Sequence, residues 1–193
     1  MKTPDLVIIF LIIFLVTFYV KENFVTEVQK IKSKTDGRSY IVRVEKDSQD
    51  AANLLGTINL KLLKLIEHLK EDHGDDERTK RLIKKYNPEA LSEGTENNNY
   101  TSYSVNKGEK IVFCLRMRDE KNNLVDENTL TYVAVHELAH VATKEIGHVP
   151  VFWENFKWML NIAKDKGIYN YVNYKEKPQP YCGLLISNNI LDN

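Results

Sequence analysis

The sequence predicts an α+β fold in which a small, partly antiparallel sheet packs on helices, with a transmembrane helix ahead of the domain. Three observations lead to this prediction. Apolar residues recur at spacings of three and four over about 48–72 and 129–145, as they do on one face of a helix. Two short β-branched segments, 39–44 and 110–116, are typical of strands. An uncharged apolar run fills positions 6–20.

The apolar run, LVIIFLIIFLVTFYV, is expected to be a single-pass membrane anchor. Its 15 residues are few against the roughly 20 that span a bilayer, but Phe18 and Tyr19 extend it into the interface. A cleaved signal peptide is the alternative, although no small-x-small cleavage site follows. The predicted organisation is therefore an anchor at 1–21, a polar linker at 22–37 and a folded domain at 38–193. Basic residues after the run place that domain on the cytosolic side by the positive-inside rule.

Composition limits the function classes. The chain has 27 basic and 27 acidic residues, so its formal net charge is zero, which argues against a dedicated nucleic-acid-binding protein. Basic clusters at 80–85 and 110–118 are interpreted as solvated faces. The two cysteines, Cys114 and Cys182, form no CxxC pair, which excludes a zinc ribbon. We expect two buried thiols, which agree with a cytosolic domain, and one disulfide is the alternative.

The remaining elements follow in order along the chain. A strand at 39–44 precedes an amphipathic helix over about 48–72 and a short helix at 77–86, which a following Asn-Pro pair ends. Residues 87–108 are expected to form a loop, and a second strand follows at 110–116. The helix over 129–145 is then followed by another at about 150–166. The apolar face of this last helix, which should pack on the helix before it, consists of Phe152, Phe156, Met159, Leu160 and Ala163.

The helix over 129–145 contains the sequence HELAH. His136 and His140 are four residues apart, so about 40° separates them around the helix axis, and both imidazoles project from one face with room for a single ion. Glu137 lies about 100° from His136, beside that ion. Asp126 or Asn128 can cap the start of the helix. The opposite side of the helix is predicted core: Ala134, Leu138, Val141 and Ala142.

The turn after this helix supplies a candidate third ligand, His148. Gly147 suits the left-handed position that ends a helix, and Pro150 suits the first turn of the next, so His148 occupies a sharp corner that can return toward the ion. Glu145 and Glu154 are alternative third ligands. Three protein ligands leave one position of a zinc ion open, which is the catalytic arrangement, whereas a structural site needs a fourth ligand.

The stretch HELAHV…GHVPVFW resembles the WLM and SprT-like zinc metalloproteases, whose site is an HExxH motif, a short spacer, and GH followed by an aromatic helix start. The resemblance covers about residues 108–165, and the strand KIVFCLR ahead of the helix fits the zincin layout. It implies a minimal zincin-like domain in which His136, His140 and His148 bind Zn2+ and Glu137 is the catalytic base. The sequence departs from crosslink-repair members by lacking a zinc ribbon and basic tails, and it adds a membrane anchor.

The expected function is that of a membrane-anchored zinc metallopeptidase acting on a protein or peptide substrate. Zinc would activate a water molecule and polarise the scissile carbonyl, and Glu137 would pass the proton to the leaving amine. Tyr181 is the candidate oxyanion-stabilising residue among the tyrosines of the tail, with aromatic packing as the competing interpretation for each. If strand 110–116 borders the cleft, an extended peptide can add to its edge.

Two other functions stay open. The first is a DNA–protein crosslink-type protease that is tethered to a membrane, for which the balanced charge gives little support. The second is a non-catalytic, zinc-stabilised interaction domain, which would bind the metal without hydrolysing anything.

Overall fold

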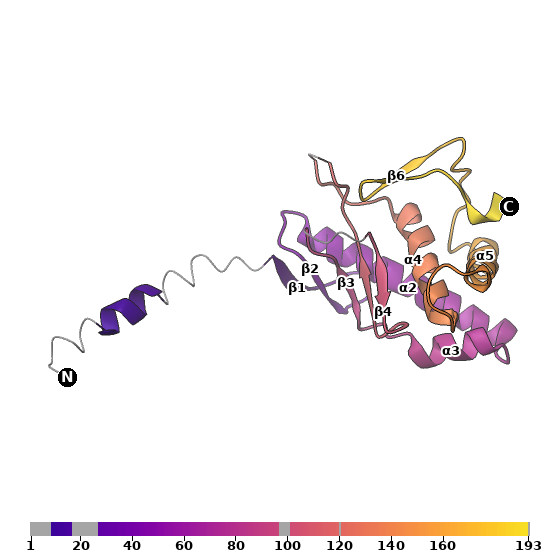
Figure 1. Cartoon of the computed structure of the whole chain (residues 1–193), viewed down its shortest axis with the longest axis horizontal. Coiled ribbons are helices and arrows are strands. Elements are labelled where there is room, and N and C mark those ends of the chain that lie inside the picture. Colours follow the sequence, from indigo (N-terminus) through magenta and orange to yellow (C-terminus); the bar gives the residue numbers. More distant parts are fainter. Residues whose placement is uncertain (1–8, 17–26, 97–100, 120, 193) are drawn as a thin grey trace.

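A computed structural model describes residues 9–16, 27–96, 101–119 and 121–192 of the chain. A five-stranded mixed sheet runs in the order β1-β2-β3-β5-β4, and a separate two-stranded hairpin, β6-β7, lies near the carboxyl terminus. Figure 1 shows α2 running behind the strands, and α4 and α5 lying beyond the β4 edge. The strands are β1 (Val28–Lys32), β2 (Ser39–Arg43), β3 (Leu91–Glu93), β4 (Tyr103–Val105), β5 (Lys110–Phe113), β6 (Gln179–Tyr181) and β7 (Leu184–Ile186).

Strand pairing in the sheet is both parallel and antiparallel. The outer pairs β1-β2 and β4-β5 are antiparallel, whereas β2-β3 and β3-β5 are parallel. The helices are α2 (Ser48–His73), α3 (Glu77–Lys85), α4 (Glu127–Ala142) and α5 (Pro150–Asp165), followed by the short 3-10 helix η1 (Ile190–Asp192). The predicted α+β class, with a partly antiparallel sheet, is therefore confirmed.

The core lies where the helices meet one another and the sheet. α2 packs on β1, β2 and β3, and it also contacts α4, while α4 contacts α3, α5 and β4. The apolar repeat of α2 is buried as its spacing predicts, because residues three and four apart share a helix face. Its fully buried members are Leu55, Ile58, Leu62, Leu65 and Leu69. The predicted core sides of α4 and α5 are buried as well.

Two segments expected to be irregular contribute strands instead. The predicted linker at 22–37 contains β1, which pairs with β2 along its whole length, so the sheet begins before position 38. β1 was missed because VQKIK is mostly polar and only its Ile31 packs against the core. The predicted loop at 87–108 contains β3 and β4, which are three residues each and too short for an alternating pattern to stand out.

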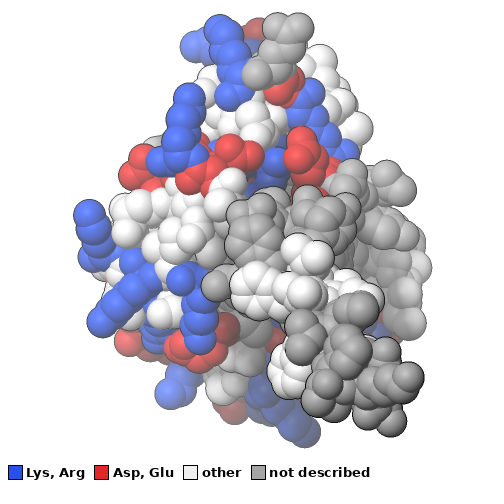
Figure 2. All heavy atoms as spheres, turned by 90° about the vertical axis from the view of Figure 1, so that its left-hand side faces the viewer, with Lys and Arg blue, Asp and Glu red and all other residues white. Residues whose placement is uncertain are grey.

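Charged side chains of both signs intersperse on the face shown in Figure 2. Among the described residues visible there, no continuous basic surface of the kind that follows a nucleic-acid backbone is present. The basic cluster at 110–118 is not uniformly solvated, which corrects one interpretation. Arg116 is 3% exposed, and its guanidinium donates to Glu93 at 2.8 Å and to Asp47 at 2.6 Å. Burial of this charge requires such partners.

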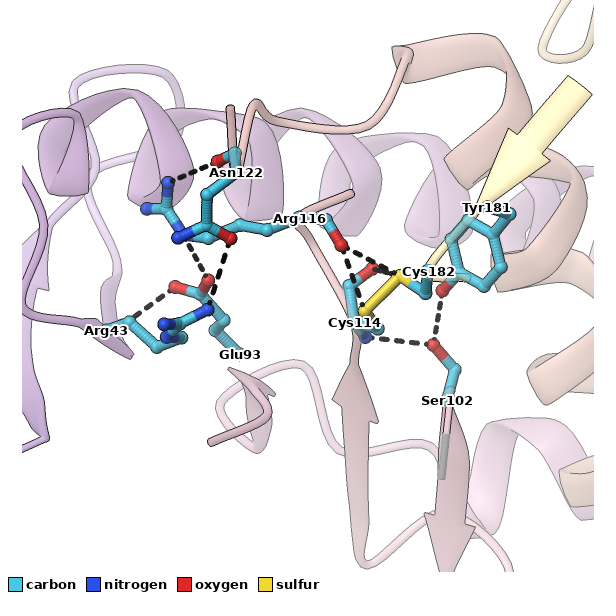
Figure 3. The surroundings of a disulfide bond; sticks show 8 residues. All are labelled: Arg43, Glu93, Ser102, Cys114, Arg116, Asn122, Tyr181 and Cys182. Carbon is cyan, nitrogen blue, oxygen red and sulfur yellow. Dashed lines mark hydrogen bonds and ion pairs between the residues drawn. A yellow bond between two sulfur atoms is a disulfide. The ribbon is translucent and has the colours of Figure 1, made fainter. Parts of the chain in front are cut away.

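The expectation of two free thiols is wrong, because Cys114 and Cys182 form a disulfide. Figure 3 shows the bond joining the segment after β5 to the end of β6. The pairing was not predictable from spacing, since 68 positions separate the two cysteines and only the fold brings them together. The argument from free thiols to a cytosolic domain is therefore withdrawn.

Positions 6–8 and 17–20 of the predicted anchor lie outside the described residues. The part that is described, 9–16, is helical, and its side chains are exposed and apolar. A search of the described helices finds none with the length and apolar character needed to cross a bilayer.

Candidate metal centre

Local sequence signals place the start of the helix α4 correctly but not its end. The Asp126 carboxylate accepts the Thr129 backbone N–H at 2.8 Å, so Asp126 is the cap that the sequence offered beside Asn128. The helix ends at Ala142, three residues earlier than predicted, with Thr143 as its C-cap. Gly147 therefore lies in the corner beyond the helix and does not end it, although the sequence had suggested that it would. Because the opposite side of α4 is anchored in the core, His136 and His140 are held toward a cavity of about 710 Å³.

The corner between α4 and α5 returns His148 to the same cavity, as predicted. Gly147 has φ +83, in the left-handed region that glycine adopts readily, and Pro150 occupies the first turn of α5. The Trp153 indole N–H donates to the His148 carbonyl at 3.0 Å. Its ring also stacks on the His148 imidazole, with centroids 5.3 Å apart. Trp153 therefore fixes both the backbone and the ring of His148.

The three histidines form a compact donor set. One ring nitrogen from each of His136, His140 and His148 lies within 4.8 Å of the others, and the Nε2 atoms of His136 and His148 are 3.0 Å apart. Among the described histidine, cysteine, aspartate and glutamate side chains, these three histidines are the group whose donor atoms lie close enough to share a metal ion. The cluster can therefore hold a metal with three nitrogen ligands.

Neither alternative third ligand belongs to this cluster. Glu145 lies beyond the end of α4 and is exposed. Glu154 is exposed on α5.

Phe152 forms the aromatic floor of the cluster. It is fully buried, and its ring centroid lies 4.2 Å from that of His140, 4.8 Å from that of His148 and 4.9 Å from that of His136. A rigid apolar floor limits the rotamers of the three imidazoles and excludes water from one side.

Burial sets the charge of the ionisable groups in the cluster. Burial, with a smaller contribution from the neighbouring histidines, lowers the pKa of His136 to about 3 and that of His140 to about 4. Both rings are therefore neutral near pH 7, which is the form that binds metals. Burial also raises the pKa of Glu137 to about 8. This carboxyl group is 4% exposed, and its Oε2 has no hydrogen-bond partner among the described residues.

Tyr181 lines the same cavity as the histidines and Glu137. Its hydroxyl lies 2.6 Å from Ser102 Oγ, and Ser102 Oγ also accepts the Cys114 backbone N–H at 3.1 Å. Figure 3 shows Tyr181, Ser102 and the disulfide gathered at one place. The disulfide at Cys182 thus fixes the residue next to Tyr181, and Ser102 fixes its hydroxyl.

The other tyrosines of the tail have structural surroundings. Tyr169 and Tyr174 are buried against Tyr132 in an aromatic cluster. Tyr171 is 46% exposed, and its hydroxyl donates to Asp192 at 2.5 Å. For these three residues, aromatic packing or surface bonding is the observed role.

The structure adds cavity residues that the sequence did not indicate. β4, together with Ser102 before it and Lys107 after it, lines the cavity. The predicted strand at 110–116 does not border the cleft as its edge, since β5 is flanked on both sides and β4 is the outer strand. No local pattern identified these residues, because their importance depends on how β4 pairs.

Comparison with known proteins identifies a family whose sequences resemble this chain. The family model described as Phycodnaviridae minor capsid protein P4 matches residues 38–172. "Uncharacterized protein R325" of Acanthamoeba polyphaga mimivirus is 33% identical over 178 residues, which are 90% of each chain. "Minor capsid protein P4" of Paramecium bursaria Chlorella virus 1 is 28% identical over 62% of this chain and 70% of its own.

The fold is similar to that of a solved structure. A mutant of Wss1 from Saccharomyces cerevisiae superposes with a TM-score of 0.50 and 20% identity, over 66% of this chain and 92% of the other. At this identity the similarity concerns the fold alone.

Proposed function

This chain belongs to the Phycodnaviridae minor capsid protein P4 family, and we propose that it is a zinc-dependent metallopeptidase. The observation that carries the proposal is the pairing of a three-histidine donor set with a buried carboxyl group, Glu137, in one cavity. The kinship with WLM and SprT-like proteases is part of the same proposal, and it is supported by the HExxH…GH spacing and by the corner that returns His148.

The donor set fits zinc. Three imidazoles, with no fourth protein ligand among the described residues, match a catalytic rather than a structural zinc site. The unpartnered Oε2 of Glu137 also calls for a polar group in the cavity, because a buried carboxyl oxygen without a partner is costly. His136, His140 and His148 would hold the ion. When bound, zinc supplies Lewis-acid polarisation of a carbonyl and lowers the pKa of water.

Two side chains of the protein are proposed to carry out the proton transfer and to stabilise the oxyanion. Glu137 would accept a proton on its free carboxyl oxygen and return it to the leaving amine. Tyr181 is the proposed donor to the developing negative charge on the carbonyl oxygen. Its contact with Ser102 holds the hydroxyl in place before substrate binds.

A protein or peptide substrate fits the edge of the sheet. Among the described strands β4 pairs with β5 alone, and it borders the cavity through Tyr103 and Ser104. An extended peptide can therefore pair with β4 by main-chain hydrogen bonds, which would lay a scissile bond beside the histidine cluster.

Hydrolysis of unfolded protein by the zinc-loaded full chain tests the proposal. Reduced, alkylated casein is incubated with wild type, Glu137→Gln and the control Glu154→Gln, and new peptide termini are identified by mass spectrometry. We expect cleavage by wild type and by the control. Glu137→Gln should be slower by about 10²- to 10⁴-fold, the usual contribution of a general acid–base group, with unchanged zinc content. Zinc-loaded wild type that cleaves nothing would contradict the proposal.

A capsid role is a second candidate, favoured by the similarity to a protein named minor capsid protein P4. In that case the histidine cluster would stabilise an interaction domain without catalysis. Bound zinc, no hydrolysis, and copurification with assembled virus particles that survives Glu137→Gln would support this function. The crosslink-type alternative instead requires DNA to stimulate cleavage, and the balanced charge of the chain gives it no support.

Membrane attachment through residues 6–20, with the domain on the cytosolic side, remains part of our proposal. The described turns at 9–16 expose large apolar side chains on all sides, which is costly in water. The full chain should float with phosphatidylcholine vesicles, and Ile12→Lys should reduce flotation. Wild-type protein that stays in the aqueous fraction would contradict membrane attachment. Protease protection in sealed vesicles would show on which side of the membrane the folded domain lies.

A further inference from the structure

The turn between β4 and β5 is fixed in an uncommon backbone conformation. Asn106 and Lys107 have φ +46 and +59, and Gly108 has φ +106. The left-handed region is unfavourable for lysine, whereas asparagine and glycine tolerate it. A non-glycine residue held there by its surroundings is an observation from which function can be sought.

Packing holds this turn against two helices. A Cβ atom added to Gly108 would lie 2.8 Å from the Lys85 carbonyl oxygen at the end of α3 and 2.9 Å from Val141 on α4. Since only glycine allows so close an approach, the turn cannot swing away from α4. Lys107 is consequently held in the lining of the cavity that contains His140 and His148.

The charges around Lys107 are mainly positive. Partial burial is the largest cause of the lowered pKa of Lys107, and the positive charges of Lys85 and Arg81 lower it as well. The carboxylate of Glu145 acts in the opposite direction and raises this pKa. The Arg81 guanidinium is already bonded to the Ala142 carbonyl. The positive charge of Lys107 also acts on His140, whose pKa it helps to lower. The surroundings of Lys107 therefore carry an excess of positive charge.

The ammonium group of Lys107 retains capacity for a ligand. It donates to the main-chain carbonyl of Glu145, and an ammonium has three donors. This contact holds the nitrogen over the corner between α4 and α5. A partly desolvated cation in a cleft attracts an anion more strongly than one on an open surface.

We propose that Lys107 determines specificity by binding a carboxylate side chain, aspartate or glutamate, of the substrate close to the scissile bond. This inference rests on the proposed peptidase function and names its substrate class. A peptide fits better than a nucleic acid because Lys107 follows directly on the edge strand β4, along which a peptide would pair. The cationic group is also small, and the chain as a whole has no basic excess.

The test compares glutamate with glutamine at each position of a peptide. A fluorescence-quenched library with blocked termini is presented to the zinc-loaded full chain, and kcat/KM is measured for each pair. We expect a preference of about tenfold for glutamate at one position, equivalent to about 1.4 kcal/mol. Lys107→Gln should reduce this ratio to near one, and Lys107→Glu should favour lysine at the same position. The control Lys110→Gln removes an exposed charge at the start of β5, outside the cavity, and should keep the ratio.

A second measurement separates this inference from the proposed function. Binding of the same peptide pairs to zinc-loaded Glu137→Gln is followed by fluorescence anisotropy, with Lys107→Gln added in the same background. A glutamate preference in binding that needs Lys107, in a chain whose wild type hydrolyses nothing, would sustain the inference and remove the peptidase function. Hydrolysis with equal rates for glutamate and glutamine would sustain the peptidase function and remove the inference about Lys107.

Three further results overturn the inference. One is the absence of any glutamate preference in both binding and hydrolysis. Another is a preference that persists in Lys107→Gln, once zinc content and thermal unfolding show that the variant is folded. The third is Lys107-dependent binding of a single-stranded oligonucleotide without discrimination between the peptides, which would assign the cationic group to nucleic acid.

Discussion

Replacing Glu137 by glutamine should stabilise the metal-free protein more and more as the pH rises. The pKa of Glu137 is raised from 4.5 to about 8 by burial, so the folded state binds this proton more tightly than the unfolded state does. Folding stability must then fall as the pH rises from 4.5 to about 8. Glutamine is a neutral side chain of the same shape, and it escapes this loss.

The size of the effect follows from the two pKa values. At about 1.4 kcal/mol per pH unit, ionising Glu137 in its buried site costs roughly 5 kcal/mol in full. Between about pH 5.5 and about pH 8.5, the stability difference between Glu137→Gln and wild type should grow by about 3 kcal/mol. His136 and His140 have lowered pKa values, so they destabilise the fold only as the pH falls below their ordinary range. Their contribution is common to both proteins and cancels.

Urea denaturation of chelator-treated protein over this pH range measures the difference directly. The control is Glu154→Gln, which removes an exposed carboxylate of α5 and should give a difference that does not grow with pH. A difference for Glu137→Gln that stays constant, or shrinks as the pH rises, would refute the assignment of Glu137 as a desolvated carboxyl group.

Three more predictions concern the framework of the site. Cys182→Ser should lower the free energy of unfolding by about 4 kcal/mol, because the disulfide no longer limits the entropy of the unfolded chain. It should also slow hydrolysis, because the residue next to Tyr181 loses its link to Cys114. An unchanged urea midpoint would contradict the predicted loss of stability. Gly108→Ala should destabilise the protein far more than Gly147→Ala. The Cβ at position 108 would collide with a main-chain oxygen of α3 and a valine of α4, whereas a Cβ at position 147 would have nothing within 4 Å. Equal shifts in the thermal unfolding temperature would contradict this prediction. Phe152→Leu should cost about 1–3 kcal/mol of stability and weaken zinc binding, as competition with a chromophoric chelator would show, and unaltered zinc affinity would refute the role of the aromatic floor.

The parts of this protein that the sequence predicts are those determined locally. The HELAH spacing, the cap at Asp126 and the Gly147–Pro150 corner each depend on residues within a few positions of one another. A helix of 3.6 residues per turn converts that spacing directly into a shared face. The structure accordingly brings His136, His140 and His148 together, as the sequence-based hypothesis requires.

The parts that escaped prediction depend on contacts between distant segments. The disulfide, the burial of Arg116 with Glu93, and the position of β4 as the outer strand all require knowledge of the sheet order. β4 has three residues and β1 is largely polar, so neither shows the alternation that identifies a strand. Lys107 carries no signal in the sequence, because its position in the cavity follows from the turn that β4 and β5 form.

The zinc content of the purified full chain tests the central claim most directly. Wild type, Glu137→Gln, His148→Ala and Glu154→Gln are supplied with zinc, desalted and measured by inductively coupled plasma mass spectrometry. The three-histidine site predicts one zinc per chain in wild type, in Glu137→Gln and in Glu154→Gln, and a clear loss in His148→Ala. Folded wild type without zinc, or His148→Ala that retains a full equivalent, would contradict the account.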